Sequence, residues 1–231
     1  MKIKIGIFGL GKAGKIVAQS LQEDEQFDLL FAVNNKVKNN DKFNFTVKPK
    51  EHIETLLEHY KPNIILDFTS PEAVINNIDK LQKGTGYIVV TTGFTEAQLQ
   101  VLKAYEHLKL LYAITISDGI NIVMKLCEAV DQVWNHADVD IIEQHFKEKK
   151  DSPSGTAQEL AKLFSSPPTI HSVRSGETVG IHEVILATAD QKITIKHESF
   201  NKKVFAEGAK KAALWLADKP NGFYNVSEMY K

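Results

Sequence analysis

The 231-residue chain carries 28 basic and 29 acidic side chains, so its net charge gives no overall attraction to nucleic acid or to a membrane surface. With 43% hydrophobic and 25% charged residues it has the composition of a globular protein, long enough for one large domain or two modest ones. Its single cysteine, Cys127, excludes an internal disulfide and a cysteine-based zinc cluster, and the apolar residues around it predict a packed thiol.

Strands and helices alternate through the first half of the sequence. Residues 2–8 have the pattern of a strand rather than of a signal peptide, and no apolar run approaches the ~18 residues of a membrane span, so we expect a cytoplasmic protein. The elements expected next are a helix over 12–22, a strand over 27–33, a helix over 52–60, a strand over 63–68, a helix over 71–81, a strand over 87–92, a helix over 96–107 and a strand over 109–114. Apolar strands that alternate with helices predict a parallel sheet covered on both faces.

The pattern changes after residue 116. The elements expected there are a helix over 121–134, a strand over 138–146, a helix beginning near Gly155, strands over 169–173, 182–187 and 192–197, and a helix over 205–216. Strands that follow one another without helices predict an antiparallel sheet. We therefore predict an α/β protein in which a Rossmann-type domain, residues 1–116 with 204–231, carries an inserted α+β domain, residues 117–203, with a mixed or antiparallel sheet.

A glycine-rich turn follows the first strand and precedes the first helix. Gly9 permits a tight turn, Gly11 lets the backbone approach a pyrophosphate, and Gly14 permits close contact between helix and strand. The free N–H groups of the helix N-terminus would then face the phosphates. This context predicts dinucleotide binding, with a purely structural turn as the alternative.

The end of the second strand bears on cofactor choice. Asn34 lies 20 residues after Gly14, and residues 33–38 contain no carboxylate that would bind a ribose hydroxyl or repel a 2′-phosphate. Lys36 or Lys38 could pair with that phosphate. We therefore expect NADPH, or both NADPH and NADH, unless these lysines only solvate a loop.

The segment 143–157 combines an acid with features that bind anions. His145 ends a strand and can release a proton near neutral pH, and Lys149 adds a positive charge. Ser154 is a good N-cap for a helix that would leave the N–H groups of Gly155 and Thr156 free for a carboxylate or phosphate. A structural histidine, a solvated lysine run and a simple cap would explain the same residues, and the spacing alone leaves both interpretations open.

This segment resembles the signature of the dihydrodipicolinate reductase family, in which Glu-x-His-His is followed by a lysine and by Asp-Ala-Pro-Ser-Gly-Thr-Ala. The residues in register are Glu143, His145, Lys149, Asp151, Pro153, Ser154, Gly155, Thr156 and Ala157. Further blocks resemble the family in order and spacing and extend the resemblance over nearly the whole chain: 67–72, 91–94, 117–121, 172–176 and 179–182.

The resemblance implies an oxidoreductase that reduces 4-hydroxy-tetrahydrodipicolinate (dihydrodipicolinate) to tetrahydrodipicolinate with NADH or NADPH, in lysine and diaminopimelate biosynthesis. It makes His145 the proton donor and Lys149 its electrostatic partner. Contacts to the small dicarboxylate substrate would come from Thr92, His145, Phe146, Lys149, Ser154, Gly155 and Thr156. Contacts to the cofactor would come from Gly9, Gly11, Lys12, Ala13, Gly14, Asn34, Lys36, Phe68, Thr69, Thr91, Thr92 and Gly93. The second domain would bind substrate and join a homotetramer through its sheet.

Several residues depart from the family pattern. Phe146 replaces a histidine that would contact substrate, Val90 replaces a glycine, Thr115 replaces an asparagine, and Asp118 occupies an apolar position. The glycine turn is one residue shorter than the commonest form in the family, and the whole chain is also somewhat shorter than usual for the family. These departures bear on substrate affinity, whereas the intact His145 and Lys149 predict activity.

Two other functions remain open. A related oxidoreductase acting on another imine or semialdehyde would explain Phe146 and Thr115. A non-enzymatic dinucleotide sensor would bind cofactor without turnover and would be indifferent to His145→Ala. An acid beside an anion site argues against the sensor.

Overall fold

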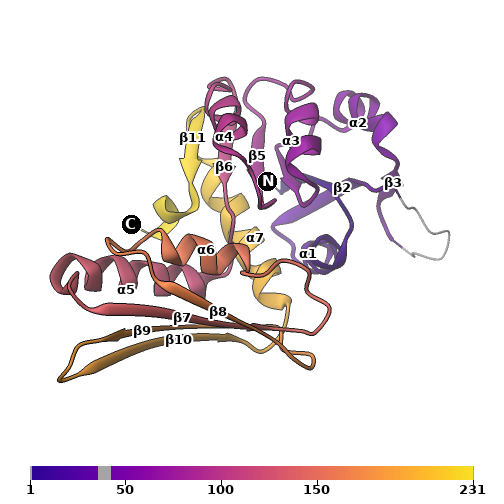
Figure 1. Ribbon diagram of the computed structural model, residues 1–231. Coiled ribbons are helices and arrows are strands. Elements are labelled where there is room, and N and C mark those ends of the chain that lie inside the picture. Colours follow the sequence, from indigo (N-terminus) through magenta and orange to yellow (C-terminus); the bar gives the residue numbers. More distant parts are fainter. Residues whose placement is uncertain (1, 36–42, 231) are drawn as a thin grey trace. The chain divides into compact units, whose positions relative to one another are not determined.

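The computed structural model describes residues 2–35 and 43–230, which form two compact units (Figure 1). The first comprises Met1–Ile116 and Phe205–Lys231, and the second comprises Ser117–Val204. Lys36 and Lys38, which were predicted to pair with a 2′-phosphate of the cofactor, lie outside the described residues.

The first unit contains a seven-stranded sheet in the order β11-β6-β5-β4-β1-β2-β3, and every neighbouring pair is parallel. Its elements are β1 (Ile3–Phe8), α1 (Lys12–Gln22), β2 (Phe27–Val33), β3 (Thr46–Lys48), η1 (Lys50–His52), α2 (Ile53–Tyr60), β4 (Ile64–Asp67), α3 (Pro71–Ile78), β5 (Gly86–Val89), α4 (Glu96–Lys103), β6 (Lys109–Tyr112), α7 (Lys203–Ala217), β11 (Gly222–Asn225) and η2 (Val226–Tyr230). The predicted Rossmann-type parallel sheet is confirmed. The connection after β1 leads to β2 on one side of the sheet, whereas the connection after β4 leads to β5 on the other side. In parallel sheets of this type, ligands bind at the carboxyl ends of the two neighbouring strands where the connections diverge.

Both faces of this sheet are buried, which explains why its central strands are apolar throughout. One core cluster joins the sheet to α1 and α7, and another joins it to α2, α3 and α4. Small residues let α7 approach closely, since a Cβ on Gly208 would lie 1.5 Å from the carbonyl oxygen of Ile116. Strands β3 and β11, which the sequence analysis did not predict, add the two edges.

The second unit contains a four-stranded sheet in the order β10-β9-β7-β8. Its elements are α5 (Asp118–Trp134), β7 (Asp138–His145), α6 (Gly155–Ala161), β8 (Thr169–Arg174), β9 (Gly180–Ala187) and β10 (Lys192–Ser199). β9 is antiparallel to β7 and β10, but β8 is parallel to β7. The predicted α+β unit with a mixed or antiparallel sheet is therefore confirmed, and the sheet is mixed because α6 forms a crossover that returns the chain in the original direction.

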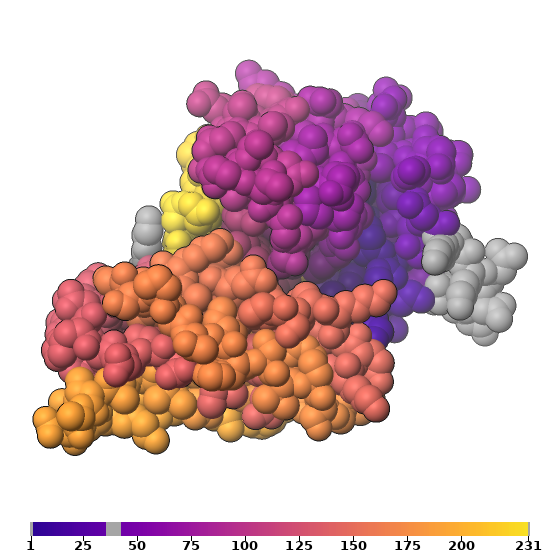
Figure 2. Space-filling view, in the orientation of Figure 1, coloured from indigo at the N-terminus to yellow at the C-terminus, as the bar shows by residue number. Residues whose placement is uncertain are grey.

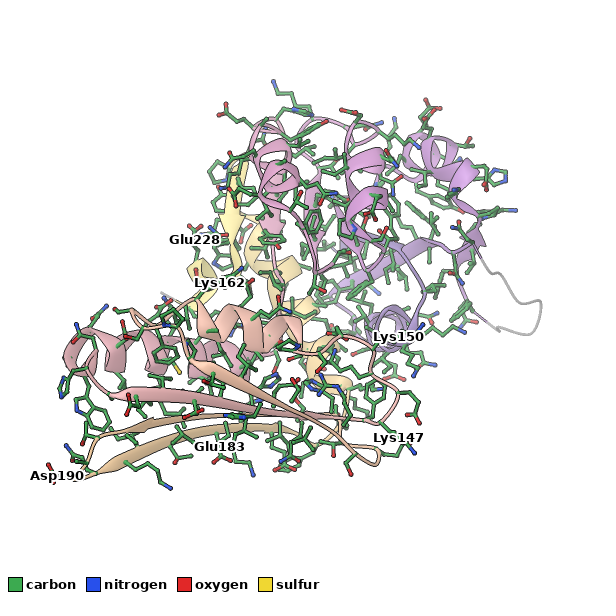
Figure 3. All side chains as sticks on the ribbon, in the orientation of Figure 1. Lys147, Lys150, Lys162, Glu183, Asp190 and Glu228 are labelled. Carbon is green, nitrogen blue, oxygen red and sulfur yellow. The ribbon has the colours of Figure 1, made fainter. Side chains whose placement is uncertain are left out.

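Helices α5 and α6 cover one face of this sheet (Figure 1). Cys127 lies in the core between them and the sheet and is a buried free thiol, as predicted, and burial raises its pKa to about 12. Glu183 of β9 points away from these helices (Figure 3). Figure 2 shows the residues of β8, β9 and β10, in orange, on the surface of this unit. One face of the sheet is therefore left open within the unit.

Within the described residues, no helix is both long enough and apolar enough to cross a membrane.

Candidate active site

The glycine turn of the first unit has the geometry of a phosphate-binding turn. Gly9 adopts a φ of +91°, and a Cβ on Gly14 would lie 2.1 Å from the Gly9 carbonyl oxygen, so both positions require glycine. Gly11 is the N-cap of α1 and makes no side-chain cap, and a Cβ there would meet nothing within 4 Å. The turn therefore leads into the N-terminus of α1 without a capping side chain, which is the arrangement of an anion-binding turn.

A cavity of about 720 Å³ lies beside this turn, at the carboxyl ends of β1, β2 and β4. Five of the predicted cofactor residues line it: Gly9, Gly11, Asn34, Phe68 and Thr69. The other described cofactor residues do not: Lys12, Ala13 and Gly14 lie in the turn and first helix, and Thr91, Thr92 and Gly93 follow β5. The neutral Asn34 and Asn35 follow β2, and Lys50, Glu51, Glu72 and Lys80 supply the charged lining.

The loop after β5 contains an unsatisfied polar atom. Among the described residues, the Thr91 hydroxyl oxygen is buried without a hydrogen-bond partner. Gly93, two residues later, has a φ of +89°. A buried hydroxyl without a hydrogen-bond partner is consistent with a loop that hydrogen-bonds to a bound ligand.

Asp67 organises the loop that contributes Phe68 and Thr69 to the cavity. Its buried carboxylate accepts hydrogen bonds from the Thr69 N–H (2.9 Å), the Thr69 hydroxyl (2.5 Å) and the Tyr87 hydroxyl (2.6 Å). Burial raises the pKa of Asp67 to about 6 despite these hydrogen bonds.

This raised pKa predicts a pH-dependent stability. The folded state holds the Asp67 proton more tightly than the unfolded chain, whose pKa is near 3.8, so the stabilisation is complete below pH 3.8 and is lost as the pH rises to about 6. The shift corresponds to a loss on the order of 3 kcal/mol. We expect the free energy of unfolding in urea, measured across this interval, to fall in wild type relative to Asp67→Asn. Parallel pH profiles for the two proteins would contradict the assignment.

A buried ionic cluster lies in the second unit around the end of β7. Glu143 and His145 are two residues apart on β7 and therefore share a face, and both are buried. Arg174 at the end of β8 holds the Glu143 carboxylate with both terminal nitrogens, at 3.0 and 2.6 Å. Burial disfavours the charge on Glu143, but hydrogen bonds from Arg174 and His145 outweigh it and lower its pKa to about 2. Glu143 is therefore a permanent carboxylate.

This carboxylate orients His145. Nδ1 of His145 lies 2.5 Å from Oε2 of Glu143 and donates to it, so Nε2 is the nitrogen left for a substrate. Gly180 keeps the space beside it open, since a Cβ there would lie 3.2 Å from Nε2. Burial lowers the pKa of His145, Glu143 opposes the shift, and the charge of Lys149 adds to it. The imidazolium form of His145 therefore releases its proton readily, and the carboxylate of Glu143 holds the ring in place.

Ser154 connects this cluster to α6. Its hydroxyl caps the helix by accepting the Ala157 N–H at 3.3 Å, and its own N–H donates to Glu143. The hydroxyl lies 3.3 Å from Nε2 of His182 and donates to it. Burial lowers the pKa of His182 to about 3, so this histidine is neutral and does not compete as an acid. The predicted N-cap role of Ser154 is confirmed.

The predicted anion-binding groups lie on the loop between β7 and α6. Lys149 donates to the Asp151 carboxylate at 2.7 Å, and the N–H of Gly155 stabilises the same carboxylate. An acidic side chain of the same loop therefore lies among the predicted anion-binding groups, and their binding of a substrate carboxylate stays a prediction. Phe146 lies 5.3 Å, ring centroid to nitrogen, from the ammonium of Lys202. Lys147 and Lys150 extend from the same loop (Figure 3).

The sequence analysis gave no role to four residues that the structure places in these networks: Asp67, Glu143, Arg174 and His182. The spacing of Glu143 and His145 on one strand could have indicated their contact. Arg174 and His182 come from other strands, and no local pattern identifies them.

Two family models together match nearly the whole chain. The model for the N-terminus of dihydrodipicolinate reductase matches residues 3–117, and the model for its C-terminus matches residues 119–230. Two similar proteins are both named 4-hydroxy-tetrahydrodipicolinate reductase. The one from Buchnera aphidicola subsp. Cinara cedri (strain Cc) is 33% identical over 100% of this chain and 97% of its own length, and the one from Rickettsia bellii (strain OSU 85-389) is 32% identical over 100% and 96%.

Solved structures share the fold. A dipicolinate-bound dihydrodipicolinate reductase from Paenisporosarcina sp. TG-14 superposes with a TM-score of 0.82 over 99% of both chains, at 24% identity. An amine dehydrogenase from Mycobacterium smegmatis superposes with a TM-score of 0.70 over 99% of this chain and 96% of that one, at 8% identity.

Proposed function

The chain belongs to the dihydrodipicolinate reductase family, and from this premise we propose which residues bind the cofactor, bind the substrate and transfer the proton. It is an oxidoreductase that reduces 4-hydroxy-tetrahydrodipicolinate with NADH or NADPH in lysine and diaminopimelate biosynthesis. The observation that carries the proposal is the joint placement of a buried, oriented acid, His145, and a cation, Lys149, at the end of β7.

The first unit would hold the dinucleotide, which supplies a hydride when bound. The turn at Gly9, Gly11, Lys12, Ala13 and Gly14 would bind the pyrophosphate, and Asn34, Phe68 and Thr69 would line the rest of the cavity. The buried Thr91 hydroxyl, with Thr92 and Gly93, would contact the nicotinamide end. We propose use of NADPH, or of both NADPH and NADH, because Asn34 and Asn35 after β2 carry no negative charge that would repel a 2′-phosphate and Lys50 lines the cavity.

The second unit would hold the substrate, a small dicarboxylate like the dipicolinate bound to the structural relative. Lys149 and the N–H groups of Gly155 and Thr156 would bind one carboxylate, with Phe146 and Ser154 as further contacts from the same unit. Nε2 of protonated His145 would deliver a proton to the carbanion-like carbon that hydride addition creates. Glu143 stabilises the imidazolium form before transfer and retains the Nδ1–H after it.

We also propose that the open face of the second unit's sheet joins copies of the chain into a homotetramer. Val173, which pairs with Gln144 on this face, is about two-fifths exposed. A cytoplasmic location fits the buried free thiol of Cys127, since reducing compartments keep such thiols unpaired.

Oxidation of reduced nicotinamide tests the proposal directly. The substrate is generated in place from pyruvate and aspartate semialdehyde by the upstream synthase, and consumption of NADPH and of NADH is followed by absorbance. We expect enzyme-dependent oxidation with both and faster oxidation of NADPH. Cofactor binding without oxidation would refute the assigned substrate. A panel of other cyclic imines and semialdehydes would then test the alternative substrate that would explain Phe146.

A further inference from the structure

The anion-binding groups of the second unit already hold a carboxylate, and it belongs to the protein. Oδ2 of Asp151 accepts a hydrogen bond from the Lys149 ammonium at 2.7 Å. The Gly155 N–H acts on the same carboxylate, and both contacts lower the pKa of Asp151 against the opposing effect of burial. These are two of the groups to which the substrate carboxylate is assigned above.

The backbone of Asp151 is anchored while its side chain is not. Nη2 of Arg174 donates to the Asp151 carbonyl oxygen at 2.6 Å, and this arginine is fixed by its contacts to the fully buried Glu143. The Asp151 side chain is 53% exposed, whereas that of Lys149 is 20% exposed. Rotation of the side chain can therefore release Lys149 without moving the loop.

We propose that Asp151 is an internal competitor for the substrate carboxylate, pairing with Lys149 in the empty site and giving way when the dicarboxylate binds. The proposal rests on the roles given to Lys149 and Gly155 under Proposed function. Asp151 lowers the affinity of every anion that needs Lys149 by the same factor, so a weakly held small anion is largely excluded while a dicarboxylate, which gains further contacts, still binds. It also keeps Lys149 in place between turnovers.

The expected size of the effect follows from the exposure of the pair. Ion pairs of this kind are favoured by only about two- to fivefold over the separated side chains, so the site is free for roughly a sixth to a third of the time. Apparent affinity falls in proportion to that fraction. Removal of the competing carboxylate therefore tightens binding by about three- to sixfold.

Calorimetric titration with dipicolinate, a dicarboxylate probe, tests this in the full chain. We expect Asp151→Asn, and Asp151→Ala as a second variant without any polar group, to bind dipicolinate about three- to sixfold more tightly than wild type. We also expect the KM for substrate to fall with little change in kcat, and inhibition by sulfate to increase. Glu148→Gln is the matched control, because it removes the same charge from an exposed position in the same loop. We expect it to leave dipicolinate affinity, KM and sulfate inhibition unchanged.

Unchanged or weaker dipicolinate binding in both Asp151 variants would overturn the proposal, as would an equal gain in Glu148→Gln. Lys149→Ala separates this failure from that of the underlying assignment. If Lys149→Ala weakens dipicolinate binding while the Asp151 variants do not tighten it, only the role of Asp151 is wrong. If Lys149→Ala has no effect on binding, the carboxylate site itself has been misplaced.

Discussion

Replacement of His145 by Gln is expected to lower kcat about 100-fold or more, the usual contribution of a positioned general acid. Glutamine retains a polar group near Glu143, but its amide N–H is not acidic enough to protonate the substrate. In wild type, kcat/KM falls as the pH rises through the pKa of His145, which burial and Lys149 hold below its ordinary value, because the protonated form is lost. That limb of the pH profile is expected to disappear in the variant.

His171→Gln provides the matched control for this experiment. His171 lies on the neighbouring strand β8, is about half exposed and pairs with Asp140 at 2.7 Å. The same substitution there changes one histidine of the same sheet without touching the cluster. A His145→Gln enzyme with the pH profile of wild type would remove His145 from proton transfer.

Lys149→Ala is expected to cost about 2–4 kcal/mol of transition-state stabilisation, the effect of losing one preorganised charged donor. This corresponds to a loss in kcat/KM of about 30- to 1000-fold. The variant also removes a positive charge that lowers the pKa of His145, so the descending limb of the pH profile is expected to move to higher pH. Both quantities come from initial rates measured across a pH series.

Lys147→Ala is the control for charge alone, because Lys147 is an exposed lysine on the same loop (Figure 3). We expect near wild-type kinetics from it. A loss of less than about tenfold in Lys149→Ala, or an equal loss in Lys147→Ala, would show that Lys149 has no specific role in the transition state.

Local sequence patterns were sufficient for most of the fold. Apolar strands alternating with amphipathic helices predicted the parallel sheet, and the glycine spacing placed the phosphate-binding turn directly after β1. The two edge strands were missed because β3 has only three residues and because β11, Gly222–Asn225, has only two apolar residues between a glycine and an asparagine. The sequence predicted α6 and a mixed or antiparallel sheet, but it did not specify which strand is parallel, because strand pairing is set by contacts between segments distant in the sequence.

The candidate site was less predictable, because its contacts cross between strands. His145, Lys149 and Ser154 lie within ten residues and could be identified together. Arg174, which fixes the charge of Glu143, lies on β8, 31 residues from it in the sequence. The pairing of Asp151 with Lys149 depends on the path of a loop that no periodicity specifies.

The placement of α7 sets an order of events during synthesis. Five of its side chains, Ala206, Ala209, Ala212, Ala213 and Leu216, complete one of the two hydrophobic clusters of the first unit. A ribosome makes residues 117–204 before it makes these, so the second unit has its whole core available while the first still exposes apolar surface beside α1. The nascent first unit therefore depends on a late segment to cover that surface, and a message truncated before residue 205 would release a chain prone to aggregate.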